Sequence, residues 1–365
     1  MDVAWEDYGT YATDIFTNEA TKAINNHNQS QPLFLYLAHL AVHSANTYMP
    51  LQAPAEIVDL FDNIQDENRR IFAGMLYKLD ESVGQVVTAL KQNGMLENSV
   101  IVFTTDNGGP AAGFNQNAAS NWPLKGVKDT LWEGGVRGSA FLWSPKLKRS
   151  SRVSNQMMNI EDWLPTLVSV AGKLLLKLNL LIAYETVFLG GDPSNLPSLD
   201  GLDMWSSLSE DTASPKNLML HNIDESRHVF HLPLNIRIVA IYQYLCFRNI
   251  AALRVGDWKL VKGTTYHGAW DAWKGPSGRG GSYDFNKIMT SPVAQSIRGI
   301  KGVKLPSRRQ MGLLRKEAEI QCNKPRHSSA CRPLQQVCLF NITADPCEYN
   351  NVVVQSRTKS FILLY

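Results

Sequence analysis

The stretch from Ile101 to Gly138 constrains this chain most, because an apolar run ends there in polar residues and glycines. Val100 to Phe103 is apolar, and after two threonines comes the sequence Asp106-Asn107-Gly108-Gly109. Such a run is typical of a buried strand that carries polar side chains at its carboxyl end, where glycines let the chain turn. Ligands bind at the carboxyl ends of strands in open α/β sheets. The stretch therefore predicts either a simple Asp-Asn-Gly turn or a binding site.

Asp106 and Asn107 are the candidate metal ligands of this stretch. A carboxylate beside an amide offers hard oxygen ligands, which suit Ca²⁺ or Mg²⁺ better than zinc or copper. Farther along, the run WPLKGVK begins at Trp122 and ends at Lys128. A metal ion together with a lysine can hold a phosphate or sulfate whose charge shifts during transfer. The combination favours an anion-binding site over a simple turn.

Three motifs in a fixed order, DNGG, NWPLKGVK and LWEGGVRG, carry a family resemblance. They resemble the sulfatase family, and within it the arylsulfatase B (N-acetylgalactosamine-4-sulfatase) type, with interruptions from about Tyr8 to Val352. The resemblance implies an α/β, alkaline-phosphatase-like sulfatase fold: a mainly parallel sheet flanked by helices, plus a small C-terminal antiparallel subdomain. It also implies hydrolysis of sulfuric esters, with a sulfated glycosaminoglycan or an aryl sulfate ester as the substrate.

The same resemblance assigns roles to four residues of this chain. Asp106 and Asn107 match a pair of ligands to one Ca²⁺ ion, and Lys128 matches a lysine that contacts the sulfate. His43 matches a catalytic histidine that contacts the sulfate and assists the leaving group. It precedes a Pro-Leu-Gln segment, as in the family, but at a longer spacing. Lys125 lies where the family also accepts a basic residue, and we interpret it as secondary.

The nucleophile of the family is a formylglycine, which is made from the cysteine of a Cys-x-Pro/Ala-x-Arg motif. That motif is absent from the 365 residues. The nearest match begins at Cys331 but ends in Gln335, so we reject it. The early acidic metal ligands of the family are also missing. We therefore expect an incomplete Ca²⁺ site and no turnover by this chain, and we interpret Met1 as an internal methionine of a truncated sequence.

Two other functions remain open at this point. A related metal-dependent phosphodiesterase would share the fold, but such enzymes use two metals held by several Asp and His residues, and the WPLKGVK and GGVRG motifs argue against it. A non-catalytic protein could instead bind sulfated glycans through the residues that remain. A binding assay with sulfated glycans would separate this protein from an inert fragment.

Apolar periodicity predicts helices over Tyr11–Asn25 and Asn68–Gln92, and a further helix that opens near Asn159. The near-continuous apolar run Pro32–Ala41 predicts a central parallel strand, with Val100–Phe103 as the next strand. A helix between two strands predicts a right-handed crossover in a parallel sheet.

The C-terminal part has a strong hairpin signal at Gly256-Asp257, between the apolar segments Ala252–Val255 and Trp258–Val261. Trp273–Arg326 is rich in Gly, Ser, Lys and Arg with little apolar periodicity, which predicts a long and partly disordered loop. Cys338–Ile342 reads as a short strand.

We expect residues 1–225 to form a partial catalytic α/β domain and residues 248–365 a C-terminal subdomain with a long loop near 273–326. Two stretches, 173–189 and 226–247, shift abruptly in composition. If both are removed, the flanking sequences rejoin in a family-like way, so we interpret both as insertions. Neither has the roughly 20 mostly apolar residues that a membrane span needs.

Composition supports an exported protein that binds no nucleic acid. The formal net charge of +3 is too mild for nucleic-acid binding, and no dense Lys/Arg block is present. Five cysteines without a CxxC pair favour disulfides, with Cys338 and Cys347 as one candidate pair and an odd cysteine left over. Sequons at Asn28 and Asn341 agree with a lysosomal or secreted glycoprotein, although no signal peptide is visible. The oligomeric state stays open.

Overall fold

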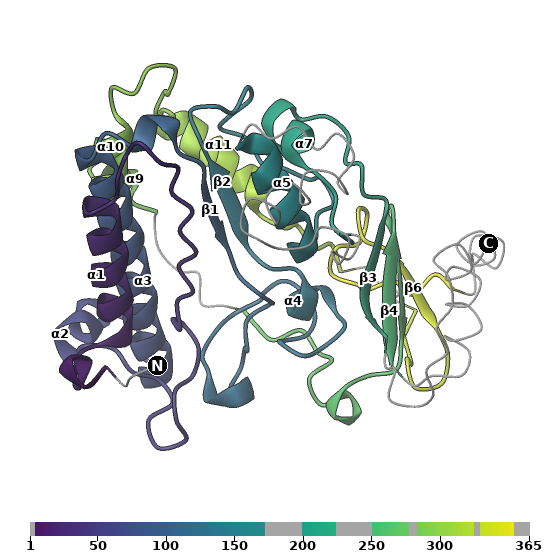
Figure 1. The fold of residues 1–365 in the computed structure, drawn as a ribbon. Helices are drawn as coiled ribbons and strands as arrows, with labels where there is room; N and C mark the ends of the chain where they lie inside the picture. Colours follow the sequence, from purple (N-terminus) through teal and green to yellow (C-terminus); the bar gives the residue numbers. More distant parts are fainter. Residues whose placement is uncertain (1–3, 172–198, 224–249, 277–282, 325–328, 354–365) are drawn as a thin grey trace, which may run out of the picture. The chain divides into compact units, whose positions relative to one another are not determined.

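The computed structural model describes residues 4–171, 199–223, 250–276, 283–324 and 329–353 (Figure 1). The chain divides into two compact units, Met1–Pro145 with Trp270–Lys316 and Lys146–Ala269 with Glu317–Tyr365. The two stretches that the sequence marks as insertions, 173–189 and 226–247, lie outside the described residues. None of the helices in the described ranges is long and apolar enough to cross a membrane.

The elements of the first unit are α1 (Ala12–Asn25), α2 (Ala55–Val58), α3 (Glu67–Gln92), β1 (Ile101–Thr104), α4 (Glu133–Val136), β2 (Ala140–Trp143), α9 (Phe285–Met289), α10 (Pro292–Ile297) and most of α11 (Arg308–Ala318). The elements of the second unit are α5 (Trp163–Val170), α7 (Trp205–Glu210), β3 (Leu218–Ile223), β4 (Ala251–Val255), β5 (Trp258–Lys262) and β6 (Cys338–Asn341).

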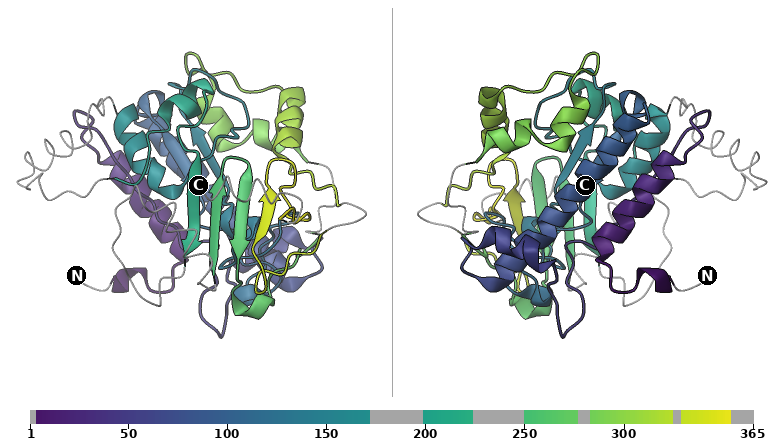
Figure 2. Two further views of the ribbon diagram at one scale, coloured as in Figure 1. Left: turned by 90° about the vertical axis from the view of Figure 1, so that its right-hand side faces the viewer. Right: turned by 90° about the vertical axis from the view of Figure 1, so that its left-hand side faces the viewer.

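The two long helices confirm the periodicity of the sequence and lie side by side (Figures 1 and 2). Asp66 caps α3 by accepting a hydrogen bond from the backbone N–H of Arg69 at 2.8 Å. The apolar stripe of α3 faces inward, with Phe72 and Met75 buried at one end and Val87 at the other. The helix therefore forms because a capped start precedes a continuous core-facing stripe.

The strand predicted before the DNGG motif is confirmed as β1, which pairs with β2 in an antiparallel sheet. Phe103 and Phe141 lie opposite each other and their rings stack at a centroid distance of 5.3 Å. Ile101 and Trp143, at the other end of the pair, pack with Val87 of α3. Helix α3 and the strand pair therefore share one apolar core, which fixes where β1 ends.

The parallel strand predicted over Pro32–Ala41 is wrong. The segment is not assigned to a strand, and neither sheet in the described ranges contains a parallel pair of strands. Its apolar side chains are largely in solvent, with Phe34 78% and Tyr36 81% exposed. The run is apolar enough for a strand, but a strand also needs a neighbour that satisfies its backbone groups, and no described strand lies against it.

The long loop predicted over Trp273–Arg326 is also wrong, because three helices, α9 to α11, lie within it. Asp284 and Ser291 cap α9 and α10 by accepting backbone hydrogen bonds in their first turns. Val293 and Ile297 of α10 pack against the core cluster of α3. Caps and tertiary contacts stabilise short helices that periodicity alone does not reveal.

The second unit is built on the four-stranded antiparallel sheet β3-β4-β5-β6, which includes the predicted hairpin at Gly256. Cys331 bonds to Cys338 and Cys322 bonds to Cys347. The suggested pairing of Cys338 with Cys347 is therefore wrong. The correct pairs have Cα atoms 5.7 and 5.9 Å apart, within the range that a disulfide spans.

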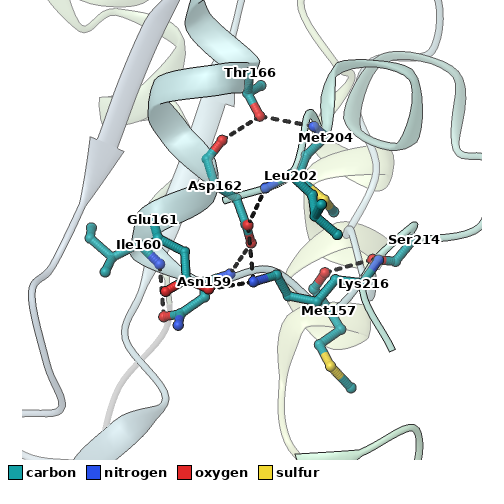
Figure 3. A network of polar contacts seen from close by, with 10 residues as sticks. All are labelled: Met157, Asn159, Ile160, Glu161, Asp162, Thr166, Leu202, Met204, Ser214 and Lys216. Atoms are coloured by element: carbon teal, nitrogen blue, oxygen red, sulfur yellow. Dashed lines mark hydrogen bonds and ion pairs between the residues drawn. The ribbon is translucent and has the colours of Figure 1, made fainter. Parts of the chain in front are cut away.

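A buried polar network anchors α5 in the second unit (Figure 3). The Asp162 carboxylate is fully buried and accepts hydrogen bonds from the backbone N–H groups of Asn159 at 2.7 Å and Leu202 at 2.8 Å. The Lys216 ammonium lies 3.0 Å from the same carboxylate and 2.6 Å from Glu161. Burial alone would lower the pKa of Lys216, but these hydrogen bonds outweigh that effect and raise the pKa.

Candidate functional site

The DNGG segment begins two residues after the end of β1. Asp106 is exposed, and Asn107 is half-buried and donates from its amide to the carbonyl of Gly108 at 2.8 Å. Thr105, just before them, exchanges hydrogen bonds with Ser139, which lies just before β2. The strand pair therefore ends at two residues whose oxygens can face a ligand.

The three motifs that carry the family resemblance interlock through backbone contacts of their glycines. The Gly108 N–H donates to the Gly135 carbonyl at 2.9 Å, and the Gly134 N–H donates to the Lys125 carbonyl at 2.6 Å. A Cβ atom on Gly108 would lie 1.9 Å from the Gly134 carbonyl oxygen. Only glycine leaves room for two backbone segments to approach this closely. The three motifs therefore pack together as one cluster of loops, which we call the loop cluster.

Asn121 holds this loop cluster together from within. Its side-chain oxygen accepts from the Gly109 N–H at 2.7 Å, and its amide donates to the Gly109 carbonyl at 2.6 Å and to the Gly126 carbonyl at 3.3 Å. The Lys128 N–H donates to the same Gly109 carbonyl at 3.2 Å. Asn121 therefore ties the DNGG segment to Gly126, two residues before the candidate lysine.

Asn117 joins the loop of His43 to the same cluster. Its side chain is buried and donates to the Val42 carbonyl at 3.0 Å and to the Ser44 hydroxyl at 3.1 Å. Sequence reasoning missed both Asn117 and Asn121. Side-chain hydrogen bonds to distant backbone groups leave no periodic pattern in a sequence. The one available sign was that Asn121 directly precedes WPLKGVK in the motif.

The structure brings the two predicted catalytic residues into contact. The Lys128 ammonium lies 3.2 Å from His43 Nε2, and His43 Nδ1 lies 2.7 Å from the Ser44 carbonyl oxygen. A carbonyl only accepts and an ammonium only donates, so Nδ1 carries the proton and Nε2 accepts from the lysine. The pair is thus a charged lysine beside a neutral histidine, both within reach of solvent.

This pair suits an anion better than a second cation. The positive charge of Lys128 has no carboxylate partner in the described part of the chain. A sulfate or phosphate group would supply an anionic partner for that charge, because its oxygens accept charge-assisted hydrogen bonds.

Asp106 and Asn107 supply two oxygen donor groups, which fit part of a Ca²⁺ site. A complete site takes 6 to 8 oxygens. Within the described ranges no group of three or more His, Cys, Asp or Glu residues is placed to hold a metal ion. Asp106 and Asn107 alone fall short of that number.

Lys125, the other lysine of the WPLKGVK motif, serves the structure of the cluster. Its side chain is buried, and its ammonium lies 3.3 Å from the centroid of the Trp132 ring and 5.0 Å from that of Trp273. Both aromatic faces attract the cation.

Cys331 is not available as a nucleophile, because its sulfur is in the disulfide with Cys338.

The family model described as Sulfatase matches residues 2–173. Mouse arylsulfatase J is 36% identical over 298 residues, which cover 81% of this chain and 45% of that protein. Mouse N-acetylgalactosamine-6-sulfatase is 30% identical over 161 residues, which cover 44% of this chain and 29% of that protein. The chain spans less than half the length of these curated relatives.

The fold class is shared with solved bacterial structures. A Bacteroides thetaiotaomicron structure from work on glycosaminoglycan metabolism has a TM-score of 0.53 at 14% identity and covers 96% of this chain and 52% of that one. These neighbours confirm the α/β, alkaline-phosphatase-like fold, with antiparallel sheet in the C-terminal part. By the family model and the curated relatives, residues 2–173 of this chain match the sulfatase family.

Proposed function

We propose that this chain is part of a sulfuric ester hydrolase of the arylsulfatase B type, acting on sulfated glycans or aryl sulfates. The observation that carries the proposal is the contact of Lys128 with His43, beside a strand end with Asp106 and Asn107. Relatives named as sulfatases and arylsulfatases support the class of reaction. The choice of arylsulfatase B over arylsulfatase J rests on the motifs alone.

Lys128 and His43 would act on the sulfate group of the substrate. Lys128 would donate to a sulfate oxygen and so stabilise the charge that shifts toward the leaving oxygen as the S–O bond breaks. His43 is held by Ser44 with Nε2 directed toward the lysine, so that nitrogen would take a proton from Lys128 or from water and pass it to the leaving oxygen. The two roles need adjacent groups, which is the arrangement that the loop cluster creates.

Asp106 and Asn107 are the proposed ligands of a Ca²⁺ ion, together with donors beyond those that this chain shows. When bound, such an ion would supply positive charge to the sulfate oxygens. The expected formylglycine would supply the nucleophile, and no cysteine of the 365 residues lies in the motif from which it is made. We therefore propose that this chain binds sulfate esters without hydrolysing them.

A purified 365-residue chain tests the proposal in two assays. It should bind a chondroitin 4-sulfate oligosaccharide, and Lys128→Ala should weaken that binding by about tenfold or more, the range of a charge-assisted hydrogen bond. It should release no product from a chromogenic aryl sulfate above background. Sulfate release that disappears in His43→Ala would contradict the second statement, and binding that ignores Lys128 would contradict the first.

The second candidate is a protein that binds sulfated glycans and is no part of a hydrolase. The observation in its favour is that the anion-binding pair is assembled while the cysteine motif is absent from the sequence. A metal-dependent phosphodiesterase has less support, because the described residues contain no acid and histidine cluster of the size that two metals need.

The lysosomal or secreted location of the protein is also a proposal. It rests on the disulfides, which persist in oxidising compartments, and on the exposed sequon at Asn28.

A further inference from the structure

The segment Trp270–Pro276 lies against the loop cluster of the candidate site and plays no part in the proposed chemistry. The Gly126 N–H donates to the Ala272 carbonyl at 3.0 Å, and Lys125 and Trp273 form an antiparallel bridge. Gly126 is two residues from Lys128, so the segment is joined by its backbone to the loop that carries the candidate lysine.

Aromatic contacts fix the segment at both ends. Trp270 packs edge-on against Phe114 at a centroid distance of 5.0 Å and covers the buried core of the loop cluster. A Cβ atom on Gly275 would lie 2.3 Å from the Trp122 ring, so this glycine sits directly on the indole. Trp273 shares the Lys125 ammonium with Trp132. The segment is therefore a packed element of the cluster.

Lys274 is the group of this segment that can meet a ligand. It is half-buried, and its ammonium lies 4.9 Å from the centroid of the Trp270 ring. No carboxylate in the described part of the chain forms an ion pair with it. The indole face holds the cation without neutralising it, because a cation–π contact leaves the formal charge in place.

We propose that Lys274 is a second anion-binding residue, which makes the site selective for an acidic glycan over a simple aryl sulfate. The inference rests on the proposed function: one sulfate group would bind at Lys128 and His43, and a second anionic group of the same chain at Lys274. A uronic acid carboxylate and a further sulfate share this chemistry, since both carry oxygens that accept charge-assisted hydrogen bonds. An aryl monosulfate has no second anion to offer.

The test compares two probes on four versions of the 365-residue chain: the wild type, Lys274→Ala, Lys128→Ala and Lys301→Ala. The probes are a chondroitin 4-sulfate tetrasaccharide and 4-methylumbelliferyl sulfate, and their dissociation constants are measured by titration calorimetry at low salt. Lys301 is an exposed lysine of the same unit, so its variant controls for the loss of one positive charge.

Lys274→Ala should weaken tetrasaccharide binding by about tenfold and change aryl sulfate binding by less than about twofold. Lys128→Ala should weaken both probes, and Lys301→Ala should weaken neither. Lys274→Arg should keep tetrasaccharide binding, which separates a lost charge from a disturbed segment. Equal weakening of both probes by Lys274→Ala, or no weakening of the tetrasaccharide, would overturn the inference. Failure of Lys128→Ala to affect the aryl sulfate would instead overturn the proposed function.

A carboxyl-reduced tetrasaccharide distinguishes the two anionic groups. If reduction removes the effect of Lys274→Ala, the lysine binds the uronate. If the effect persists, the lysine binds a second sulfate. Both results support a second anion contact and identify the anion. If the unreduced tetrasaccharide binds the wild type and Lys274→Ala equally well, the inference is contradicted.

Discussion

The Lys128 ammonium lies 3.2 Å from His43 Nε2, although 85 residues separate the two in sequence. Two asparagines support this contact. Asn117 donates to the Val42 carbonyl and the Ser44 hydroxyl on either side of His43, and Asn121 joins Gly109 to Gly126, two residues before Lys128. In the described part of the chain Lys128 has no carboxylate partner, and this is the basis on which we propose the pair as an anion-binding site.

The glycine interlock predicts a large loss of stability on Gly108→Ala. The new Cβ atom would lie 1.9 Å from a backbone oxygen of Gly134, and backbone cannot move aside as a flexible side chain can. We expect a loss of at least about 2 kcal/mol in the free energy of unfolding, measured by chemical denaturation. Gly312→Ala, in α11 where the nearest atom is 3.8 Å away, should be neutral or stabilising. Equal effects of the two substitutions would contradict the interlock.

The Asp162 network predicts that Asp162→Ala strongly destabilises the second unit. The substitution would leave the buried Lys216 ammonium without one of its two partners and two backbone N–H groups without an acceptor. Breaking a buried ion pair costs about 3–5 kcal/mol, which urea denaturation would register. The exposed pair of Lys22 and Glu19 is the control, since Glu19→Ala should change stability by less than about 1 kcal/mol.

The helices and strands of the fold differ in how well the sequence predicts them. Helix α3 is predicted by its apolar periodicity, and the β4–β5 hairpin is predicted by the turn residues at its tip. The run Pro32–Ala41 has the composition of a strand, but pairing depends on a neighbour that composition cannot reveal. Helices α9 and α10 depend on side-chain caps, and α10 also packs against α3, a contact that becomes visible only in three dimensions.

The candidate site was predictable only in part and for a physical reason. Asp106, Asn107 and Lys128 lie in motifs that are visible in the sequence, so they could be named as candidates before the structure. The contact of Lys128 with His43, and the sandwich of Lys125 between two tryptophans, depend on how distant loops pack. No local pattern encodes such contacts.

His39 predicts a pH dependence of stability in the acidic range. Burial lowers the pKa of its imidazole, whose Nδ1 is buried without a hydrogen-bond partner while Nε2 contacts Ser82 at 3.2 Å. The folded state therefore binds a proton less readily than the unfolded state, and stability falls as the pH drops below about 6.5 toward the folded pKa. His39→Gln cannot titrate, so its melting temperature should fall less than that of the wild type between pH 7.5 and 5. Parallel curves for the two proteins would exclude this role.

The incomplete donor set predicts weak calcium binding by this chain. Asp106 and Asn107 provide far fewer than the 6 to 8 oxygens of a typical site, so little binding energy is available to stabilise the fold. Addition of 1 mM Ca²⁺, or of a chelator, should shift the melting temperature by less than about 1 °C. A rise of several degrees with Ca²⁺ that Asp106→Ala abolishes would show that further donors complete the site.

The most direct test of the central claim, that Lys128 and His43 bind one sulfate group together, is a double-mutant cycle. The dissociation constant of a chondroitin 4-sulfate tetrasaccharide is measured for the wild type, Lys128→Ala, His43→Ala and the double variant. If both side chains hold the same sulfate, the double variant should bind little more weakly than the weaker single variant, because the first substitution already removes most of the site. Losses that simply multiply, or binding that is unchanged in Lys128→Ala, would contradict the claim.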